Sequence, residues 1–143
     1  MEVTSFEQSE ALLDAGLSRE SADLWWIERY VGEWVGNDEE GNNKEYDVKP
    51  VTYLSFVNDS MYNTSGDKII ATPAWSLGKL IRIFDDRSFE LNIYDGTWTA
   101  SEGYMPYVLP YVLPRWAHQT FDDTAIGAVV KLILKLKGEG IEI

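Results

Sequence analysis

The chain contains no cysteine, and this absence removes three kinds of chemistry at once. Disulfide cross-links, thiolate nucleophiles and Cys-ligated zinc sites all require that residue. Histidine is almost as scarce, because His118 is the only one, and a single imidazole does not form a multi-histidine metal site. No nucleophile motif accompanies His118 for a Ser–His relay. The sequence therefore predicts no catalytic residue, no metal and no cofactor, and it favours a non-enzymatic protein.

The chain also lacks long apolar runs and a basic leader. Its first residues, Met1–Glu7, contain neither the basic nor the apolar stretch of a signal peptide. No apolar run approaches the roughly 20 residues that a bilayer-spanning helix requires. Together with the lack of cysteine, these features predict a cytoplasmic protein without a membrane partner.

Recognised ligand-binding loops are missing as well. Pro73 stands where a P-loop ending in Gly78-Lys79 would have its first glycine, so that phosphate-binding loop is excluded. When the acidic stretch of residues 36–43 is aligned with a calcium loop, Gly36 falls at the first ligand position and supplies no side-chain oxygen. No dedicated cation or nucleotide site is predicted.

Basic residues are scarce in the first third of the chain. The chain carries 24 acidic and 12 basic side chains, a net charge of −12, and residues 1–48 account for −10 of it. This field repels phosphate backbones, so the helix-turn-helix spacing within residues 12–25 does not indicate DNA binding, and no nucleic-acid partner is expected. The same field favours a basic protein partner. Solubility alone and mimicry of a nucleic acid by an acidic surface stay open as alternatives.

The chain does contain enough apolar surface for a folded core. Of its 143 residues, 45% are hydrophobic and 13% aromatic, which predicts a single α+β domain over residues 1–143. We expect a helical hairpin plus an irregular acidic segment over residues 1–71. A three-stranded antiparallel sheet flanked by helices (α-β-β-β-α) is expected over residues 72–143. Residues 36–50 are predicted to be a loop and residues 51–57 to be extended.

Capping signals predict the two N-terminal helices. Ser5-x-x-Gln8 has the spacing of a capping box, and its helix is expected to end before Gly16. Ser18 is expected to cap a second helix that reaches Trp25-Trp26 and completes the hairpin. Residues 25–31 either extend that helix or begin a strand, and the pattern does not decide between the two.

The most specific local signal is a β-hairpin within Phe89–Glu102. Asp95-Gly96 stands between two alternating segments, which predicts a two-residue type I′ turn. Pairing outward from that turn puts Ile93 opposite Trp98, with the apolar side chains on one face.

The hairpin is expected to lie between helices. Ser76 is a candidate N-cap for the preceding helix, and residues 116–121 are predicted to form a third strand. Asp122 or Asp123 is expected to cap the last helix, and Gly138 is expected to end it. Four apolar positions predict its buried stripe: Ile126, Val129, Val130 and Ile133.

Three segments of the C-terminal half stand in a recognisable order. They are Pro-Ala-Trp-Ser-Leu-Gly-Lys-Leu (73–80), the strand pair around Ile93-Tyr94 and Trp98, and Asp-Asp-Thr-Ala-Ile-Gly-Ala-Val-Val (122–130). In this order the chain resembles small uncharacterised proteins of gut Bacteroidetes and their mobile elements, and it is similar to the phage "ABA sandwich" domain. The resemblance implies an α–β₃–α architecture and a phage or mobile-element context. It implies no activity.

An aromatic, proline-containing repeat follows the hairpin. Pro-Tyr-Val-Leu occurs twice in residues 106–114, and its prolines exclude a helix or a central strand. Tyrosine and tryptophan dominate interface hot spots, so four residues here are candidates for partner binding: Tyr104, Tyr107, Tyr111 and Trp116. The alternative is that these rings cover the sheet as part of the chain's own core.

The leading functional hypothesis is a non-enzymatic accessory protein of phage or mobile-element origin that acts through protein–protein contacts. The partner would be a host protein, a phage protein or a second copy of the chain. The first alternative is a hydrolase or small-ligand-binding module with a site that the sequence does not reveal. The second alternative is an acidic nucleic-acid mimic.

Overall fold

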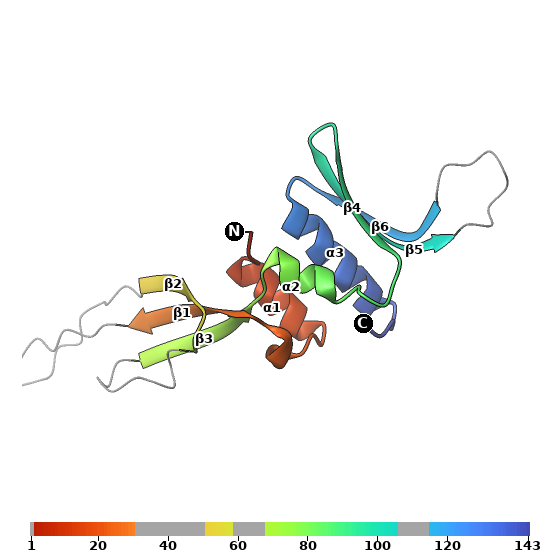
Figure 1. Cartoon of the computed structure of the whole chain (residues 1–143). Helices are drawn as coiled ribbons and strands as arrows, with labels where there is room; N and C mark the ends of the chain where they lie inside the picture. Colours follow the sequence, from red (N-terminus) through yellow and green to blue (C-terminus); the bar gives the residue numbers. More distant parts are fainter. Residues whose placement is uncertain (1, 31–50, 59–67, 106–114) are drawn as a thin grey trace, which may run out of the picture. The chain divides into compact units, whose positions relative to one another are not determined.

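The computed structural model describes residues 2–30, 51–58, 68–105 and 115–143 (Figure 1). These residues form helices and strands in separate blocks, so the predicted α+β class is confirmed. In chain order the elements are α1 (Phe6–Asp14), the 3₁₀ turn η1 (Arg19–Ser21), β1 (Leu24–Tyr30), β2 (Val51–Ser55), β3 (Lys68–Ala74), α2 (Leu77–Arg82), β4 (Phe89–Tyr94), β5 (Thr97–Met105), β6 (Arg115–Asp122) and α3 (Ala125–Gly138). Among the described residues, no helix combines the length and the apolar composition needed to cross a membrane.

The chain divides into two compact units. Unit 1 consists of Met1–Asp23 together with Ala74–Ile143, and unit 2 consists of Leu24–Pro73. The division predicted after residue 71 falls close to Pro73, but the first 23 residues pack with the C-terminal part. Unit 2 is therefore an insertion in the sequence of unit 1.

The prediction of one three-stranded sheet is wrong, because the described residues form two. Unit 2 has a sheet with strand order β2-β1-β3, and unit 1 has an antiparallel sheet with strand order β4-β5-β6. The strand β2 covers most of the segment that was predicted to be extended, and it pairs antiparallel with β1. The strand β3 was not predicted. The order α2, β4, β5, β6, α3 in unit 1 follows the helix–strands–helix order expected for residues 72–143.

The core of unit 1 is built around α3. This helix contacts the strands β4, β5 and β6 and also the helices α1 and α2 (Figure 1). The predicted stripe is buried, and so are further positions of α3: Ala125, Ala128, Leu132 and Leu136. Leu12 and Leu17 from the N-terminal segment lie in the same cluster as Trp75, Leu80 and Phe84. Burial of these side chains supplies the main favourable free energy for folding.

The prediction of the first N-terminal helix is confirmed, and the prediction of the second is wrong. Ser5 and Gln8 form the capping box of α1, and Gly16 follows the helix with a φ of +100°. The chain then makes only the three-residue turn η1, whose following residue Ala22 is already extended. Trp25-Trp26 lies in β1, the central strand of its sheet. Aromatic and β-branched residues favour a strand once two neighbours are available for pairing.

The predicted hairpin is confirmed in turn type and register. Asp95 and Gly96 have φ values of +52° and +79°, the left-handed pair that a type I′ turn requires. Ile93 pairs with Trp98, as expected from counting outward from the turn. The third predicted strand is also confirmed and forms β6, which pairs antiparallel with β5.

The ends of α3 differ from the prediction by a few residues. Thr124, not Asp122 or Asp123, is the N-cap, and its Oγ1 accepts a hydrogen bond of 3.0 Å from Gly127 N. Asp122 supports this cap from outside the helix, since its carboxylate accepts hydrogen bonds from the N and Oγ1 atoms of Thr124 at 3.0 and 2.9 Å. At the other end α3 includes Gly138, and the left-handed residue after it is Gly140 with a φ of +75°.

The support that Asp122 gives to α3 should depend on pH. A hydrogen bond and ion pair with Lys131 at 2.8 Å, together with the hydrogen bond from the Thr124 amide, hold the pKa of Asp122 below its ordinary value. A carboxyl whose folded pKa is depressed stabilises the fold above its unfolded pKa, and this stabilisation is lost as the pH falls through the folded pKa. We expect Asp122→Asn to lower the free energy of unfolding by up to about 1 kcal/mol at pH 7. The difference should shrink below about pH 4.

Urea unfolding of the wild type and Asp122→Asn between pH 2.5 and 7 measures this dependence. Asp123→Asn is the matched control, because the neighbouring carboxylate is exposed and makes none of these contacts. A loss of stability in Asp122→Asn that stays constant across the whole range would contradict the prediction.

Candidate partner-binding site

Two of the four aromatic candidates come together in the structure. Tyr104 on β5 pairs with Trp116 on β6, and their ring centroids lie 5.5 Å apart at an interplanar angle of 64°. This edge-to-face arrangement is one that aromatic pairs prefer. Tyr107 and Tyr111 lie outside the described residues.

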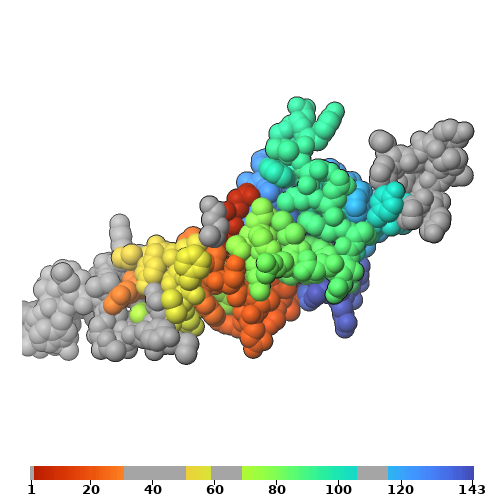
Figure 2. All heavy atoms as spheres, viewed as in Figure 1, coloured from red at the N-terminus to blue at the C-terminus, as the bar shows by residue number. Residues whose placement is uncertain are grey.

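The pair lies where β5 and β6 extend past β4 (Figure 1). Figure 2 shows the end of β5 in cyan next to the start of β6 in light blue. The pairing of β4 with β5 stops at Phe89 and Glu102, whereas β5 and β6 continue to Met105 and Arg115. At the point of departure Gly103 has a φ of +76°, and its N donates a 3.0 Å hydrogen bond to the carbonyl oxygen of Ser88. The left-handed residue turns β5 away from β4.

A side chain at Gly103 would also disturb the contact between β5 and β6. A Cβ atom added there would lie 2.8 Å from the Cβ atom of Ala117, closer than real side chains approach. Ser88 Oγ accepts a 2.8 Å hydrogen bond from Tyr104 N, which fixes the next residue of β5 as well. The backbone that carries Tyr104 is therefore held from both sides.

Large apolar groups stay exposed at this end of the sheet. Tyr104 is 46% exposed and Met105 is 44% exposed, while Trp116 is partly buried beside them. We call Tyr104, Met105 and Trp116 the aromatic end. It lies two residues beyond the pair Glu102 and His118, and His118 contacts Glu139, the residue that follows α3.

A network of ionisable side chains lies next to the aromatic end. His118 Nδ1 lies 3.0 Å from Glu102 Oε2, and His118 Nε2 lies 2.6 Å from Glu139 Oε2. The other carboxylate oxygen of Glu102 accepts a 3.2 Å hydrogen bond from Arg87. Arg87 also donates to the carbonyl oxygen of Glu142. These contacts join β5, β6 and the segment after α3.

The arrangement of this network indicates a structural role, in which it holds neighbouring segments together. Both ring nitrogens of His118 face carboxylate oxygens, so neither is directed at a substrate. Glu102 is only 7% exposed and is paired on both oxygens, as a buried charge must be to avoid a large desolvation cost. The sequence placed His118 within the strand predicted over residues 116–121, but it did not identify the two carboxylates.

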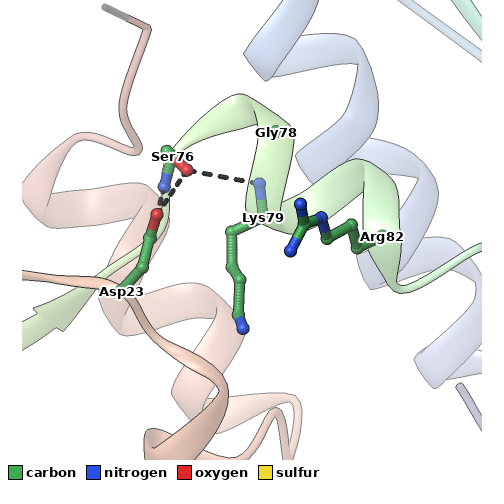
Figure 3. Close-up of a pocket in the computed structure, with 5 residues that line it drawn as sticks. All are labelled: Asp23, Ser76, Gly78, Lys79 and Arg82. Carbon is green, nitrogen blue, oxygen red and sulfur yellow. Dashed lines mark hydrogen bonds between the residues drawn. The ribbon is translucent and has the colours of Figure 1, made fainter.

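A second feature of unit 1 is a pocket beside α2 (Figure 3). It has a volume of about 270 Å³ and is lined by Asp23, Ser76, Gly78, Lys79 and Arg82. Ser76, predicted as an N-cap, accepts a 3.2 Å hydrogen bond from Lys79 N. No sequence motif marked this pocket, because Asp23 lies 53 residues before Ser76.

Metal and acidic-surface sites receive no support from the part of the chain that the structure describes. Those residues contain no group of three or more His, Cys, Asp or Glu side chains that could hold a metal ion. The acidic stretch of residues 36–43, considered for calcium, lies outside the described residues.

Comparison of the chain with protein-family models, curated proteins and solved structures finds no match. The geometry of the described residues therefore carries the functional proposal.

Proposed function

We propose that this chain is a non-enzymatic accessory protein that binds another protein through the aromatic end of β5 and β6. The observation that carries the proposal is the exposure of Tyr104 and Met105, at 46% and 44%, next to the partly buried Trp116. Tyrosine, tryptophan and methionine are enriched at the centres of protein interfaces. Their large side chains offer apolar surface whose burial against a partner is favourable.

The support beneath the aromatic end favours binding without a large entropy cost. Gly103 and Ser88 fix the backbone of Tyr104, and the contacts of Glu102 and His118 fix the strand pair two residues before it. A surface that is already ordered loses little conformational freedom when a partner arrives. Preorganisation of this kind distinguishes the aromatic end from single exposed apolar side chains, such as Tyr94 at the hairpin tip.

The negative net charge of the chain favours a partner of opposite charge. The chain carries a net charge of −12, so two copies repel each other and a basic protein is attracted. Basic side chains also bind favourably over the faces of Tyr and Trp rings. The partner inferred from these properties is a protein with exposed Arg or Lys residues, and self-association is the less favourable outcome.

A phage or mobile-element origin is part of the proposal. It rests on the resemblance of the C-terminal half to the phage "ABA sandwich" domain, in which a three-stranded sheet is flanked by helices. The order α2, β4, β5, β6, α3 agrees with that architecture. The cytoplasmic location and the absence of nucleic-acid and membrane partners stay predictions.

The alternative functions have less to support them. For the alternative of a hydrolase or small-ligand-binding module, no observation on the described residues favours the hydrolase, because the pocket beside α2 contains one carboxylate, that of Asp23, and no histidine or paired acid. The nucleic-acid mimic depends on the carboxylates of residues 1–48, many of which lie outside the described residues.

Removal of the exposed ring tests the proposal. We expect Tyr104→Ala to reduce partner recovery in affinity capture by about tenfold or more, which corresponds to about 1.4 kcal/mol, because truncation of an interface hot spot has effects of this size. A photocrosslinking residue at position 105 should become linked to the same partner. The captured protein is identified by mass spectrometry and its affinity is measured with the purified pair.

Tyr94→Ala is the matched control, since Tyr94 is an aromatic residue of the same sheet that is 83% exposed. Its capture should equal that of the wild type. Equal recovery by Tyr104→Ala and the wild type, or crosslinks from position 94 and not from 105, would contradict the proposal.

A further inference from the structure

Two basic side chains, those of Lys79 and Arg82, line the pocket beside α2. Lys79 and Arg82 stand three residues apart on α2, where neighbouring like charges repel. Neither forms an ion pair or a side-chain hydrogen bond with any described residue. The chain has twice as many acidic as basic side chains, and Arg87 and Lys131 are both paired with carboxylates. The pocket therefore brings together two cations that are not ion-paired.

The opposite wall of the pocket carries a fixed carboxylate (Figure 3). Asp23 Oδ1 accepts a hydrogen bond of 2.9 Å from Ser76 N, and Asp23 Oδ2 accepts one of 2.5 Å from Ser76 Oγ. Each carboxylate oxygen has a second acceptor position, so Asp23 retains capacity for a donor from a ligand. Because Ser76 orients both oxygens, the fold determines the direction from which a ligand donor can reach Asp23.

Gly78 lies in the wall of the pocket and carries no side chain. A Cβ atom added at Gly78 would meet no atom within 4 Å, so this part of the pocket wall is bare. The volume of about 270 Å³ lies just below the usual range for small-molecule sites and suits a small ligand. The lining carries two positive charges and one negative charge, which complements a ligand with a net negative charge and a separate hydrogen-bond donor.

We propose that this pocket binds a small organic anion whose carboxylate or phosphate group contacts the side chains of Lys79 and Arg82 and whose donor group contacts Asp23. Arginine pairs with both kinds of oxyanion through two parallel hydrogen bonds, and lysine adds a point charge. The site is separate from the aromatic end, and it stands or falls independently of protein binding there.

Titration of the ¹⁵N-labelled chain with three probes tests the site: inorganic phosphate, acetate and phosphoethanolamine. We expect saturable shifts of the amide signals of Ser76, Gly78, Lys79 and Arg82. Phosphoethanolamine should bind about tenfold more tightly than inorganic phosphate, because its ammonium group supplies the donor for Asp23. The ratio of acetate to phosphate affinity identifies which oxyanion the two cations prefer.

Two double variants separate the pocket from general electrostatics. Lys79→Gln with Arg82→Gln should weaken binding of phosphoethanolamine at least tenfold. Lys135→Gln with Lys137→Gln removes the same charge from the last turn of α3 and should leave binding unchanged. In both variants, signals remote from the substitutions report that the fold is intact.

Three results would overturn the proposal. Equal weakening by the two double variants would show attraction by net charge alone. Shifts that do not saturate at about 50 mM of any probe would show an adventitious ion only. A phosphoethanolamine affinity no greater than that of inorganic phosphate would remove the role of Asp23.

Discussion

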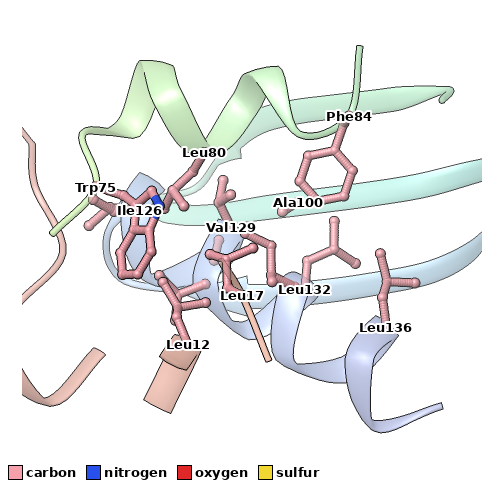
Figure 4. Close-up of a cluster of buried hydrophobic side chains, with 13 residues drawn as sticks. Leu12, Leu17, Trp75, Leu80, Phe84, Ala100, Ile126, Val129, Leu132 and Leu136 are labelled. Atoms are coloured by element: carbon pink, nitrogen blue, oxygen red, sulfur yellow. The ribbon is translucent and has the colours of Figure 1, made fainter. Parts of the chain in front are cut away.

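Replacement of Trp75 by alanine is expected to lower the free energy of unfolding by about 3–5 kcal/mol. Trp75 is completely buried and is the largest of the fully buried side chains in the described core. It lies in one cluster with Leu12 and Leu17 from the start of the chain and with Leu80 of α2 (Figure 4). Truncation leaves a cavity that these neighbours fill only in part, because they are held by separate elements.

Polar contacts add to the loss at Trp75. The indole Nε1 donates a 3.0 Å hydrogen bond to Ser21 Oγ. The backbone of the same residue exchanges hydrogen bonds with Thr4, whose Oγ1 accepts from Trp75 N at 3.0 Å and whose N donates to Trp75 O at 2.9 Å. Thr4 is fully buried and its Oγ1 lies 2.8 Å from Ser9 Oγ. A shift of the backbone at residue 75 would leave buried polar groups unpaired, which costs free energy beyond the cavity.

Urea unfolding followed by circular dichroism measures the loss, and Trp75→Phe divides it. Phenylalanine keeps most of the ring volume but removes the donor to Ser21, so we expect a loss of about 1–2 kcal/mol for that variant. Tyr94→Ala should change stability by less than about 0.5 kcal/mol, since its side chain is largely exposed. A Trp75→Ala loss as small as that of Tyr94→Ala would show that the indole is not part of the core.

Gly127→Ala is expected to destabilise the protein by about 2–3 kcal/mol, although alanine is the better helix former. A Cβ atom at this position in the first turn of α3 would overlap the Oδ2 atom of Asp122 and lie 2.7 Å from Thr124 Oγ1. Both oxygens belong to the cap, because Thr124 Oγ1 accepts the hydrogen bond from Gly127 N and Asp122 orients Thr124. The added methyl group therefore either introduces steric strain or displaces Asp122 and Thr124 and so disrupts the N-cap.

The sign of the effect is the diagnostic feature of this prediction. Gly138 lies in the same helix with open space around it, so Gly138→Ala should be neutral or stabilising by up to about 1 kcal/mol. Asp122→Ala combined with Gly127→Ala should cost less than the sum of the single changes, because the first removes the carboxylate that the second meets. Thermal or urea unfolding of the wild type, the two single variants at positions 122 and 127 and the double variant completes the double-mutant cycle. Additive losses, or a stabilised Gly127→Ala, would contradict this account of the cap.

Local sequence signals predicted the parts of the fold in which neighbours in sequence are also neighbours in space. Asp95-Gly96 determines both the turn and the register of the hairpin, because only a few residues separate the paired positions. Ser5, Gln8 and Ser76 act within one helical turn, so their caps were also predictable. At the start of α3 several capping residues stand together, and the choice of Thr124 over Asp122 required the position of Lys131, which binds Asp122.

Features that depend on distant residues were not predictable from local patterns. Trp25-Trp26 forms a strand because β2 and β3 pair on both sides of β1, and neither partner is adjacent in the sequence. The same limit applies to the site. Tyr104 and Trp116 were identified as candidates one by one, but their contact and the pairing of Glu102 with His118 depend on a strand register across residues 106–114. A pattern of alternation within each strand does not define that register.

The insertion of unit 2 has a consequence for the order of events during synthesis. Leu12 and Leu17 belong to a core that includes Trp75 and Leu80 but is completed only by α3, so the N-terminal segment reaches its full set of partners only when the residues through Leu136 have left the ribosome. Contacts across such a long stretch of chain form slowly, because the intervening segment must be closed into a loop first. The helix α1 therefore stays without its complete core while unit 2 and the strands β4, β5 and β6 are synthesised, and unit 1 completes its core only after α3 has emerged.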